Sequence, residues 1–166
     1  MKWSITIPHI FDNPYLYGGA EVIRVYLDNC CFNRPYDKQN LLKVRIETQS
    51  KMSIQQSVLD GKVELIWSFI LEYENDQNPF IERRKQIEKW QNKAIIDCSL
   101  SEQILEKSEE LMKLGLREKD SFHVACAIYE GADYFITTDT KILNKSISEI
   151  KVISPVDFVY LTEGEI

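Results

Sequence analysis

Short apolar runs alternate along this chain with longer segments that have helical periodicity. The first run, at 22–27, is rich in β-branched residues and ends at Asp28. Further strands are expected at 63–67, 94–98, 134–137 and 152–153, and helices at about 39–60, from 68 onward, and at 101–114, 120–131 and 140–144. Strands that alternate with helices in this way predict an α/β fold with a mainly parallel sheet.

Capping residues mark where several of these helices begin and end. Ser68 and Ser101 are well suited to accept hydrogen bonds at helix N-termini, and Gly61 and Gly115 are suited to end the preceding helices. The segment that holds Pro35, between the first strand and the 39–60 helix, is expected to be a loop.

The chain is long enough for one domain with a substantial core, at 166 residues. Its first part differs from the rest, because Pro8, Pro14, Gly18 and Gly19 interrupt both helical and strand periods. We therefore expect an irregular N-terminal extension at 1–21, followed by a single domain at 22–166.

The apolar stretches and the cysteines indicate where in the cell the protein is expected. The longest apolar stretch, at 64–73, is too short to cross a bilayer, and no apolar segment typical of a secretory signal lies near the N-terminus. The four cysteines have no C-x-x-C spacing, which favours free thiols in a reducing compartment over disulfides or zinc ligands. We expect a cytoplasmic protein that is not bound to a membrane.

The net charge of −6 at first speaks against a nucleic-acid partner, which usually requires a basic surface. A site that gathers carboxylates to bind divalent cations also makes a protein acidic, and the bound cations reverse the local charge. Among the basic residues, Arg34, Arg83 and Arg84 are candidates for phosphate contacts, although basic groups of this kind are more often solvated helix faces.

Four acidic residues stand where ligands bind in parallel sheets, near the carboxyl ends of strands. Asp28 follows the first strand, and Asp139 follows the fourth. Glu74 lies in the helix after the second strand, and Asp120 opens the helix that leads to the fourth. Each has a structural explanation by itself: a helix N-cap for Asp120 and Asp139, a turn for Asp28, a solvated helix face for Glu74. Together they favour a site for Mg²⁺ or Mn²⁺, which prefer hard oxygen ligands.

Other chemistries lack their sequence motifs. The chain has no G-x-x-x-x-G-K-[ST], no G-x-G-x-x-G and no G-x-S-x-G. His123, three residues after Asp120, is interpreted either as a partner of the acidic site or as a packed helix histidine, and the second is favoured. The pair Cys30 and Cys31 has no nearby histidine in sequence, which disfavours a thiol nucleophile.

Four blocks of sequence resemble the PIN-domain nucleases, including the VapC-like toxins of toxin–antitoxin pairs. The blocks are Val25–Asp28, Ser68–Glu74, Lys119–Ala127 and Gly131–Asp139. In the second block the family's spacing, an acid six residues after a serine, favours Glu74 over Glu72. The chain departs from the family at Asn29-Cys30 and at Ser121-Phe122, and neither change removes a carboxylate.

The resemblance implies a three-layer α/β/α fold with four to five strands and a metal-dependent endoribonuclease acting on single-stranded RNA. Asp28, Glu74, Asp120 and Asp139 would hold one or two Mg²⁺ or Mn²⁺ ions, which activate water and stabilise the phosphate charge. Thr137 or Thr138 would orient the water or a phosphate oxygen. A cognate antitoxin and a homodimer are the partners that the family suggests.

Three alternatives remain open at this point. A phosphohydrolase with Asp28 as covalent nucleophile would need D-x-D, but the third residue is Cys30. A catalytically silent PIN-like module that binds RNA or protein is disfavoured by the presence of all four acids. An RNA-processing nuclease without an antitoxin would use the same residues, and the compact chain favours the toxin.

Overall fold

The computed structural model describes residues 22–162, and the expected extension at 1–21 lies outside this range. Five strands form one sheet in the order β3-β2-β1-β4-β5, and every neighbouring pair is parallel. The strands are β1 Ile23–Leu27, β2 Val63–Ser68, β3 Ile96–Cys98, β4 Tyr134–Ile136 and β5 Lys151–Ile153. The predicted α/β fold with a mainly parallel sheet is therefore confirmed, and the sheet is parallel throughout.

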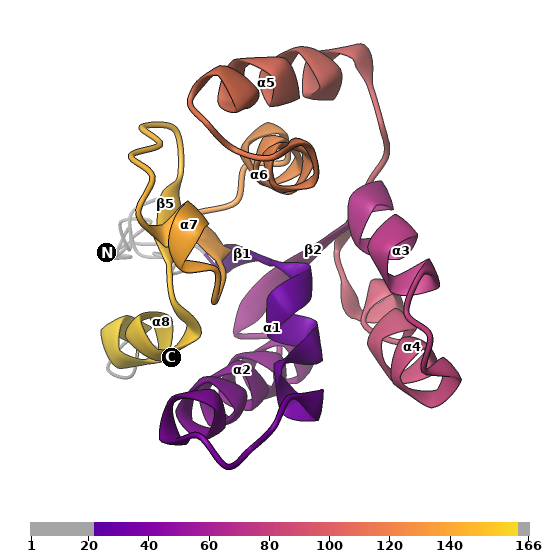
Figure 1. Cartoon of the computed structure of the whole chain (residues 1–166), viewed down its shortest axis with the longest axis vertical. Helices are drawn as coiled ribbons and strands as arrows, with labels where there is room; N and C mark the ends of the chain where they lie inside the picture. Colours follow the sequence, from indigo (N-terminus) through magenta and orange to yellow (C-terminus); the bar gives the residue numbers. More distant parts are fainter. Residues whose placement is uncertain (1–21, 163–166) are drawn as a thin grey trace, which may run out of the picture.

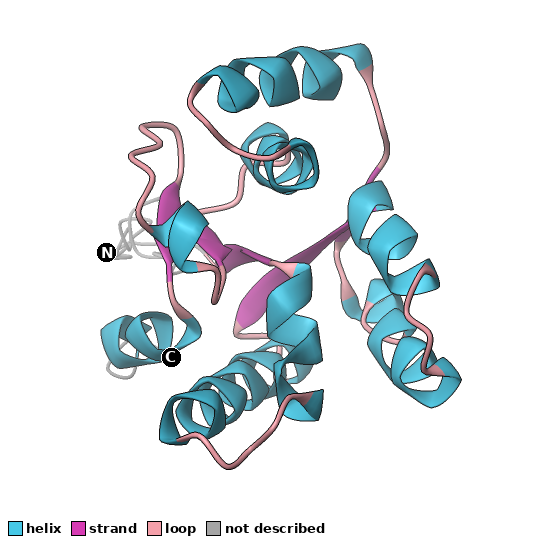
Figure 2. Ribbon diagram, in the orientation of Figure 1, coloured by secondary structure: helices cyan, strands magenta, loops and turns pink. Residues whose placement is uncertain are grey.

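Helices cover both faces of this sheet and give three layers (Figures 1 and 2). In Figure 1, α5 and α6 lie above the strands, α1, α2 and α8 lie below them, and α3 and α4 lie toward the β2 side. The helices are α1 Asn29–Asn33, α2 Leu42–Leu59, α3 Phe69–Asp76, α4 Ile81–Glu88, α5 Glu102–Lys113, α6 Glu118–Tyr129, α7 Thr140–Leu143 and α8 Pro155–Thr162, with short 3₁₀ helices η1 Arg34–Tyr36 and η2 Gln91–Lys93. No helix within residues 22–162 is long and apolar enough to span a membrane.

The expected capping residues act as predicted at α3 and α5. The hydroxyl of Ser68 accepts a hydrogen bond from the Leu71 N–H, and that of Ser101 accepts one from the Ile104 N–H, each at 3.3 Å. Gly115 follows α5 with a φ of +91°, a conformation that residues with a Cβ rarely adopt. Local sequence therefore defines these helix ends.

Three segments differ from the sequence-based expectation. The expected loop before α2 begins with α1 and η1, because the Asp28 carboxylate accepts a hydrogen bond from the Asn29 N–H at 2.7 Å and caps α1. Helix α6 begins at Glu118, since Arg117 is the extended residue before it, so Asp120 lies in the first turn and is not the N-cap. Helix α8 was not predicted.

The centre of the sheet is buried on both faces, and the order of its strands places the candidate site. Val25, Tyr26 and Leu27 of β1 have no exposed surface, as expected for a strand covered by helices on each side. The chain runs from β1 to β2 and β3 on one side and returns to β4 and β5 on the other. Connections therefore diverge at the carboxyl ends of β1 and β4, which is where ligands bind in open parallel sheets.

Candidate active site

The Asp28 carboxylate is held in place at the end of β1. The backbone N–H of Asp28 donates to the Ile136 carbonyl at 2.9 Å, which joins this residue to the end of β4. Its Oδ2 accepts hydrogen bonds from the Thr137 hydroxyl at 2.7 Å and from the Cys30 thiol at 3.2 Å. With the Asn29 N–H on Oδ1, three donors fix a carboxylate that is 6% exposed.

Thr137 connects Asp28 to Asp139. Its hydroxyl donates to Asp28 and accepts a hydrogen bond from the Asp139 N–H at 3.0 Å. Asp139 caps α7, as predicted, because its Oδ1 accepts a hydrogen bond from the Lys141 N–H at 2.8 Å. The Thr137 hydroxyl therefore joins the Asp28 carboxylate to the backbone of Asp139.

Arg117 lies between Asp120 and Asp139. Its Nε donates to Asp120 at 2.8 Å, and its Nη2 donates to Oδ2 of Asp139 at 2.9 Å. Burial raises the pKa of Asp120, as do the charges of Asp28 and Asp139, while Arg117 acts in the opposite direction. The guanidinium thus supplies positive charge where carboxylates gather.

Glu74 is oriented by a buried hydrogen-bond network. Nε2 of His123 contacts a Glu74 oxygen at 2.8 Å, and Nδ1 contacts the Tyr26 hydroxyl at 2.7 Å. The Tyr26 hydroxyl lies 2.6 Å from Oγ of Ser68, which also caps α3. The network therefore extends from the centre of the sheet to the acidic site.

Charge and burial act in opposite directions on this histidine–glutamate pair. Burial disfavours the charged forms, lowering the pKa of His123 and raising that of Glu74. Their mutual hydrogen bond and charges outweigh it, together with the charge of Asp28 near His123 and that of Lys119 near Glu74. The net result is a raised pKa for His123 and a lowered pKa for Glu74. A protonated His123 donates from both ring nitrogens, so the Tyr26 hydroxyl accepts from Nδ1 and donates to Ser68.

All four sequence-predicted acids line one open cavity of about 390 Å³. Glu72, the alternative to Glu74, is an exposed residue outside it. The other residues around the cavity are polar or charged, apart from the thiol of Cys30: Asn29, Asn33, Arg34, Asp37 and Arg117. The fold therefore collects acids that are far apart in sequence.

Carboxylate and hydroxyl oxygens are the ligand type that Mg²⁺ and Mn²⁺ prefer. Within residues 22–162 no group of three His, Cys, Asp or Glu side chains is close enough to hold a metal ion. The four carboxylates still fit a hard divalent cation in their chemistry, although Arg117 pairs with two of them, Asp120 and Asp139.

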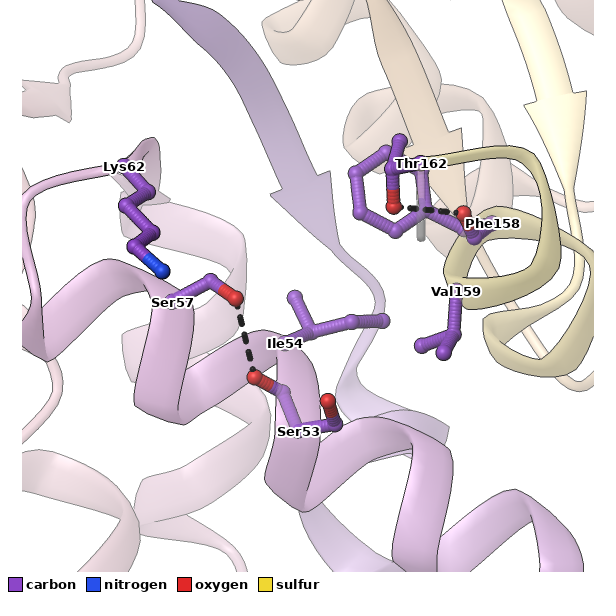
Figure 3. A pocket seen from close by; sticks show the side chains of 7 residues that line it. All are labelled: Ser53, Ile54, Ser57, Lys62, Phe158, Val159 and Thr162. Atoms are coloured by element: carbon purple, nitrogen blue, oxygen red, sulfur yellow. Dashed lines mark hydrogen bonds between the residues drawn. The ribbon is translucent and has the colours of Figure 1, made fainter. Parts of the chain in front are cut away.

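A second cavity, of about 220 Å³, lies between α2 and α8 (Figure 3). Two of its hydroxyls are engaged by their own helices, since Ser57 donates to the Ser53 carbonyl and Thr162 donates to the Phe158 carbonyl. Among residues 22–162, its charged lining residue is Lys62, and no acid or histidine of this range lines it. The acidic cavity is therefore the better candidate for chemistry.

Sequence reasoning did not identify Arg117 or Tyr26 as parts of the site. Arg117 precedes Asp120 by three residues, and that spacing places side chains on one helix face, so a local signal existed. Tyr26 gave no such signal, because it stands in an apolar strand among core residues. The partner role of His123, which the sequence disfavoured, is the one that the geometry supports.

No protein-family model matches this sequence, and no curated protein is similar to it in sequence. Its structure resembles the crystal structure of VapBC2 from Rickettsia felis bound to a DNA fragment from their promoter, with a TM-score of 0.52 and 13% identity. The match covers 80% of this chain and 98% of the other. This likeness shows a shared fold, and the five-stranded parallel sheet between helices agrees with the PIN-like architecture that the sequence motifs imply.

Proposed function

We propose that this protein is a metal-dependent endoribonuclease that hydrolyses phosphodiester bonds in single-stranded RNA. The observation that carries the proposal is the convergence of Asp28, Glu74, Asp120 and Asp139 on one cavity at the carboxyl ends of β1 and β4. Carboxylates that gather in one place repel one another unless positive charge compensates them, and Arg117 compensates only two of these four acids. The motifs around Asp120 and Asp139 point to the same chemistry.

The four acids would hold the metal. A Mg²⁺ or Mn²⁺ ion bound there would activate water and stabilise negative charge on the phosphate. Asp28 is fixed by Thr137 and Cys30, and Glu74 is kept ionised and oriented by His123. These contacts organise the oxygen ligands before substrate arrives, which lowers the cost of forming the site.

Single-stranded RNA is the proposed substrate because its flexible backbone can enter a recessed acidic cavity, whereas a duplex cannot bend into it. A biological role as the toxin of a toxin–antitoxin pair extends the proposal. It is supported by the VapC-like sequence blocks and by the structural likeness to VapBC2. A small antitoxin that covers the acidic cavity is the partner that this role requires.

The test is cleavage of single-stranded RNA by the purified protein with Mn²⁺ or Mg²⁺. We expect EDTA to abolish cleavage and Asp28→Asn to lower it by more than about 100-fold, since loss of outer-shell partners alone costs metalloenzymes 10–100-fold. Glu72→Gln is the matched control: it removes an exposed acid of the same helix outside the cavity and is expected to retain activity. Cleavage that survives EDTA or Asp28→Asn contradicts the metal–carboxylate mechanism.

The result of this experiment, together with the genes beside this one, distinguishes the competing functions. RNA binding without cleavage under any metal condition would favour a catalytically silent binding module. Cleavage by a protein whose gene has no antitoxin beside it would favour an RNA-processing nuclease.

A further inference from the structure

Two groups of exposed aromatic rings, each paired with a cation, adjoin the acidic cavity. The Arg83 guanidinium stands over the rings of Tyr36 and Phe80, with 4.7 and 4.5 Å from its central carbon to the ring centroids. Tyr36 is 41% exposed and Phe80 is 58% exposed. The second pair places Nζ of Lys119 5.4 Å from the ring centroid of Tyr73, which is 51% exposed.

The Tyr36–Arg83–Phe80 stack adjoins the cavity through η1 and the α3–α4 connection. Tyr36 stands in the chain between Arg34 and Asp37, which both line the cavity. The α3–α4 connection is tied to the same wall, because the Asn78 amide donates to the Asn33 side chain at 3.3 Å. The Asn78 side chain also accepts a hydrogen bond from the Phe80 N–H. The stack is therefore anchored at the cavity rim.

The Tyr73–Lys119 pair adjoins the cavity on the α6 side. A hollow of about 290 Å³ is lined by Lys119 and Glu118 and shares Glu74, Arg117 and Asp120 with the acidic cavity. Tyr73 directly precedes Glu74 in α3. Figure 1 shows α3, which carries Tyr73, between α6 and α4, so the two stacks reach the acidic cavity from neighbouring elements.

Rings held in this way are suited to nucleobases. Each unpaired base has a π-face that stacks on an exposed aromatic side chain or on a guanidinium plane. A cation on one face of the ring fixes its orientation, so less side-chain entropy is lost when a base binds the other face. Bases in a duplex have no free face, and such sites therefore select single strands.

The structure gives the three arginines of this region different roles. Arg34 is paired with Asp37 and with the buried Glu47, each at 2.9 Å, so its charge is already compensated. Arg84 donates to the Asp76 carbonyl at 3.2 Å. The Arg83 guanidinium instead lies over two aromatic rings, which assigns it to stacking and not to the phosphate contact expected from sequence.

We propose that Tyr36–Arg83–Phe80 and Tyr73–Lys119 are two nucleobase-stacking sites that hold bases next to the phosphate placed over the acidic cavity. The inference rests on the proposed nuclease function and names the part of the RNA that the protein grips. Single-stranded RNA is favoured over a peptide as occupant, because each ring is already paired with a cation and the surface between the stacks is polar.

The test compares steady-state cleavage of single-stranded RNA by wild type, Phe80→Ala, Tyr36→Ala and Tyr73→Ala. We expect each variant to raise KM about 5- to 150-fold, the loss typical of one base–aromatic stack, with kcat changed less than threefold. Phe80→Trp, which keeps an aromatic ring at this position, is expected to have a KM close to that of the wild type. Tyr160→Ala is the matched control, because Tyr160 is 84% exposed on α8, away from the cavity rim.

A second readout is independent of cleavage. RNA that carries 2-aminopurine loses fluorescence when the modified base stacks, and we expect quenching by wild type that Phe80→Ala or Tyr73→Ala removes. Cleavage with unchanged KM and unchanged quenching in these variants overturns the stacking sites while the nuclease function stands. Quenching without cleavage by wild type supports the stacking sites and contradicts the nuclease function.

Discussion

Arg117 is the residue expected to affect metal binding at the acidic cavity most. It is largely exposed and bridges Asp120 and Asp139, so it occupies ligand oxygens that a divalent cation would use. The guanidinium relieves repulsion among the acids in the absence of metal, and the same contacts compete with metal binding. Local charge balance and metal affinity are therefore coupled through one side chain.

Replacing Arg117 with glutamine is expected to strengthen Mn²⁺ binding. Two exposed ion pairs are each worth less than about 1 kcal/mol, so their loss should lower the dissociation constant by roughly 2- to 10-fold. Isothermal titration calorimetry at fixed ionic strength measures this change. Arg117→Lys keeps the charge but cannot contact both acids as the guanidinium does. Its dissociation constant for Mn²⁺ should lie between those of the wild type and Arg117→Gln. Weaker binding by Arg117→Gln would show that the arginine supports the metal site and does not compete with it.

Tyr26 supports the orientation of Glu74 through His123. Tyr26→Phe removes the hydroxyl and leaves Nδ1 of His123 and Oγ of Ser68 without this buried partner. We expect a loss of about 1–3 kcal/mol in the free energy of unfolding, the cost of unpaired buried polar groups, together with a 10- to 100-fold loss of cleavage. Urea unfolding measures the first effect. Tyr160→Phe, on the exposed ring of α8, is the control and should change neither quantity.

At the level of elements, helix α2 contains a buried lysine, Lys51, whose charged form lowers the free energy of unfolding. This side chain is 6% exposed, and its Nζ lies 5.8 Å from the centroid of the Phe32 ring. Burial lowers the pKa of Lys51 to about 8, while the nearby Cys31 acts in the opposite direction. In the unfolded chain the pKa of a lysine is near 10.4, so the folded state holds this proton less tightly.

Stability is therefore expected to rise with pH in a defined window. Between about pH 8 and pH 10.4 the unfolded state binds more protons at Lys51 than the folded state, so the free energy of unfolding increases with pH. Below pH 8 the cost of the buried charge is present in full. Lys51→Met should thus stabilise the protein by about 1–3 kcal/mol at pH 7 and remove this part of the rise.

Urea unfolding of wild type and variant at pH 7, 8.5 and 10 checks this prediction through the difference between the two proteins. Lys38→Met, at an exposed position shortly before the same helix, is the control. A stability difference that is independent of pH would contradict the lowered pKa.

At the scale of the whole molecule, the site exists only when the fold is complete. Its acids come from the end of β1, from α3, from α6 and from the start of α7. They are separated by up to 111 positions in the chain, as Asp28 and Asp139 are. An ion that binds them together binds the folded state and not the unfolded chain, so its binding energy adds to the stability of the domain.

Mn²⁺ is therefore expected to raise the melting temperature. At a concentration about 100 times the dissociation constant, the gain is about 2.7 kcal/mol, which corresponds to roughly 5–10 °C for a domain of this size. Thermal unfolding with Mn²⁺ and with EDTA measures it. Asp139→Asn should abolish the shift while keeping the α7 cap, because asparagine caps helices as well as aspartate does. Glu72→Gln should retain the shift. A wild-type melting temperature that does not change with Mn²⁺ would contradict metal binding at the acidic cavity.

Much of the fold was predictable because its signals are local. The five strands, the caps at Ser68 and Ser101 and the helix end at Gly115 follow from periodicity and capping preferences within a few residues. The placement of the acids near strand ends was likewise readable, and parallel pairing then brings those ends to one edge. Helix α1 was not predicted, because its five residues are too few to show a helical period.

The sequence by itself determined which acids stand near the ends of strands, since strand and acid are neighbours in the chain. Only the tertiary structure decided what each acid contacts. Arg117 bridges to Asp139 across 22 positions and Tyr26 reaches His123 across 97, and such contacts depend on strand order and helix packing. No local pattern encodes them, because their partners meet only after β1 has paired with β4 and α6 has packed on the sheet.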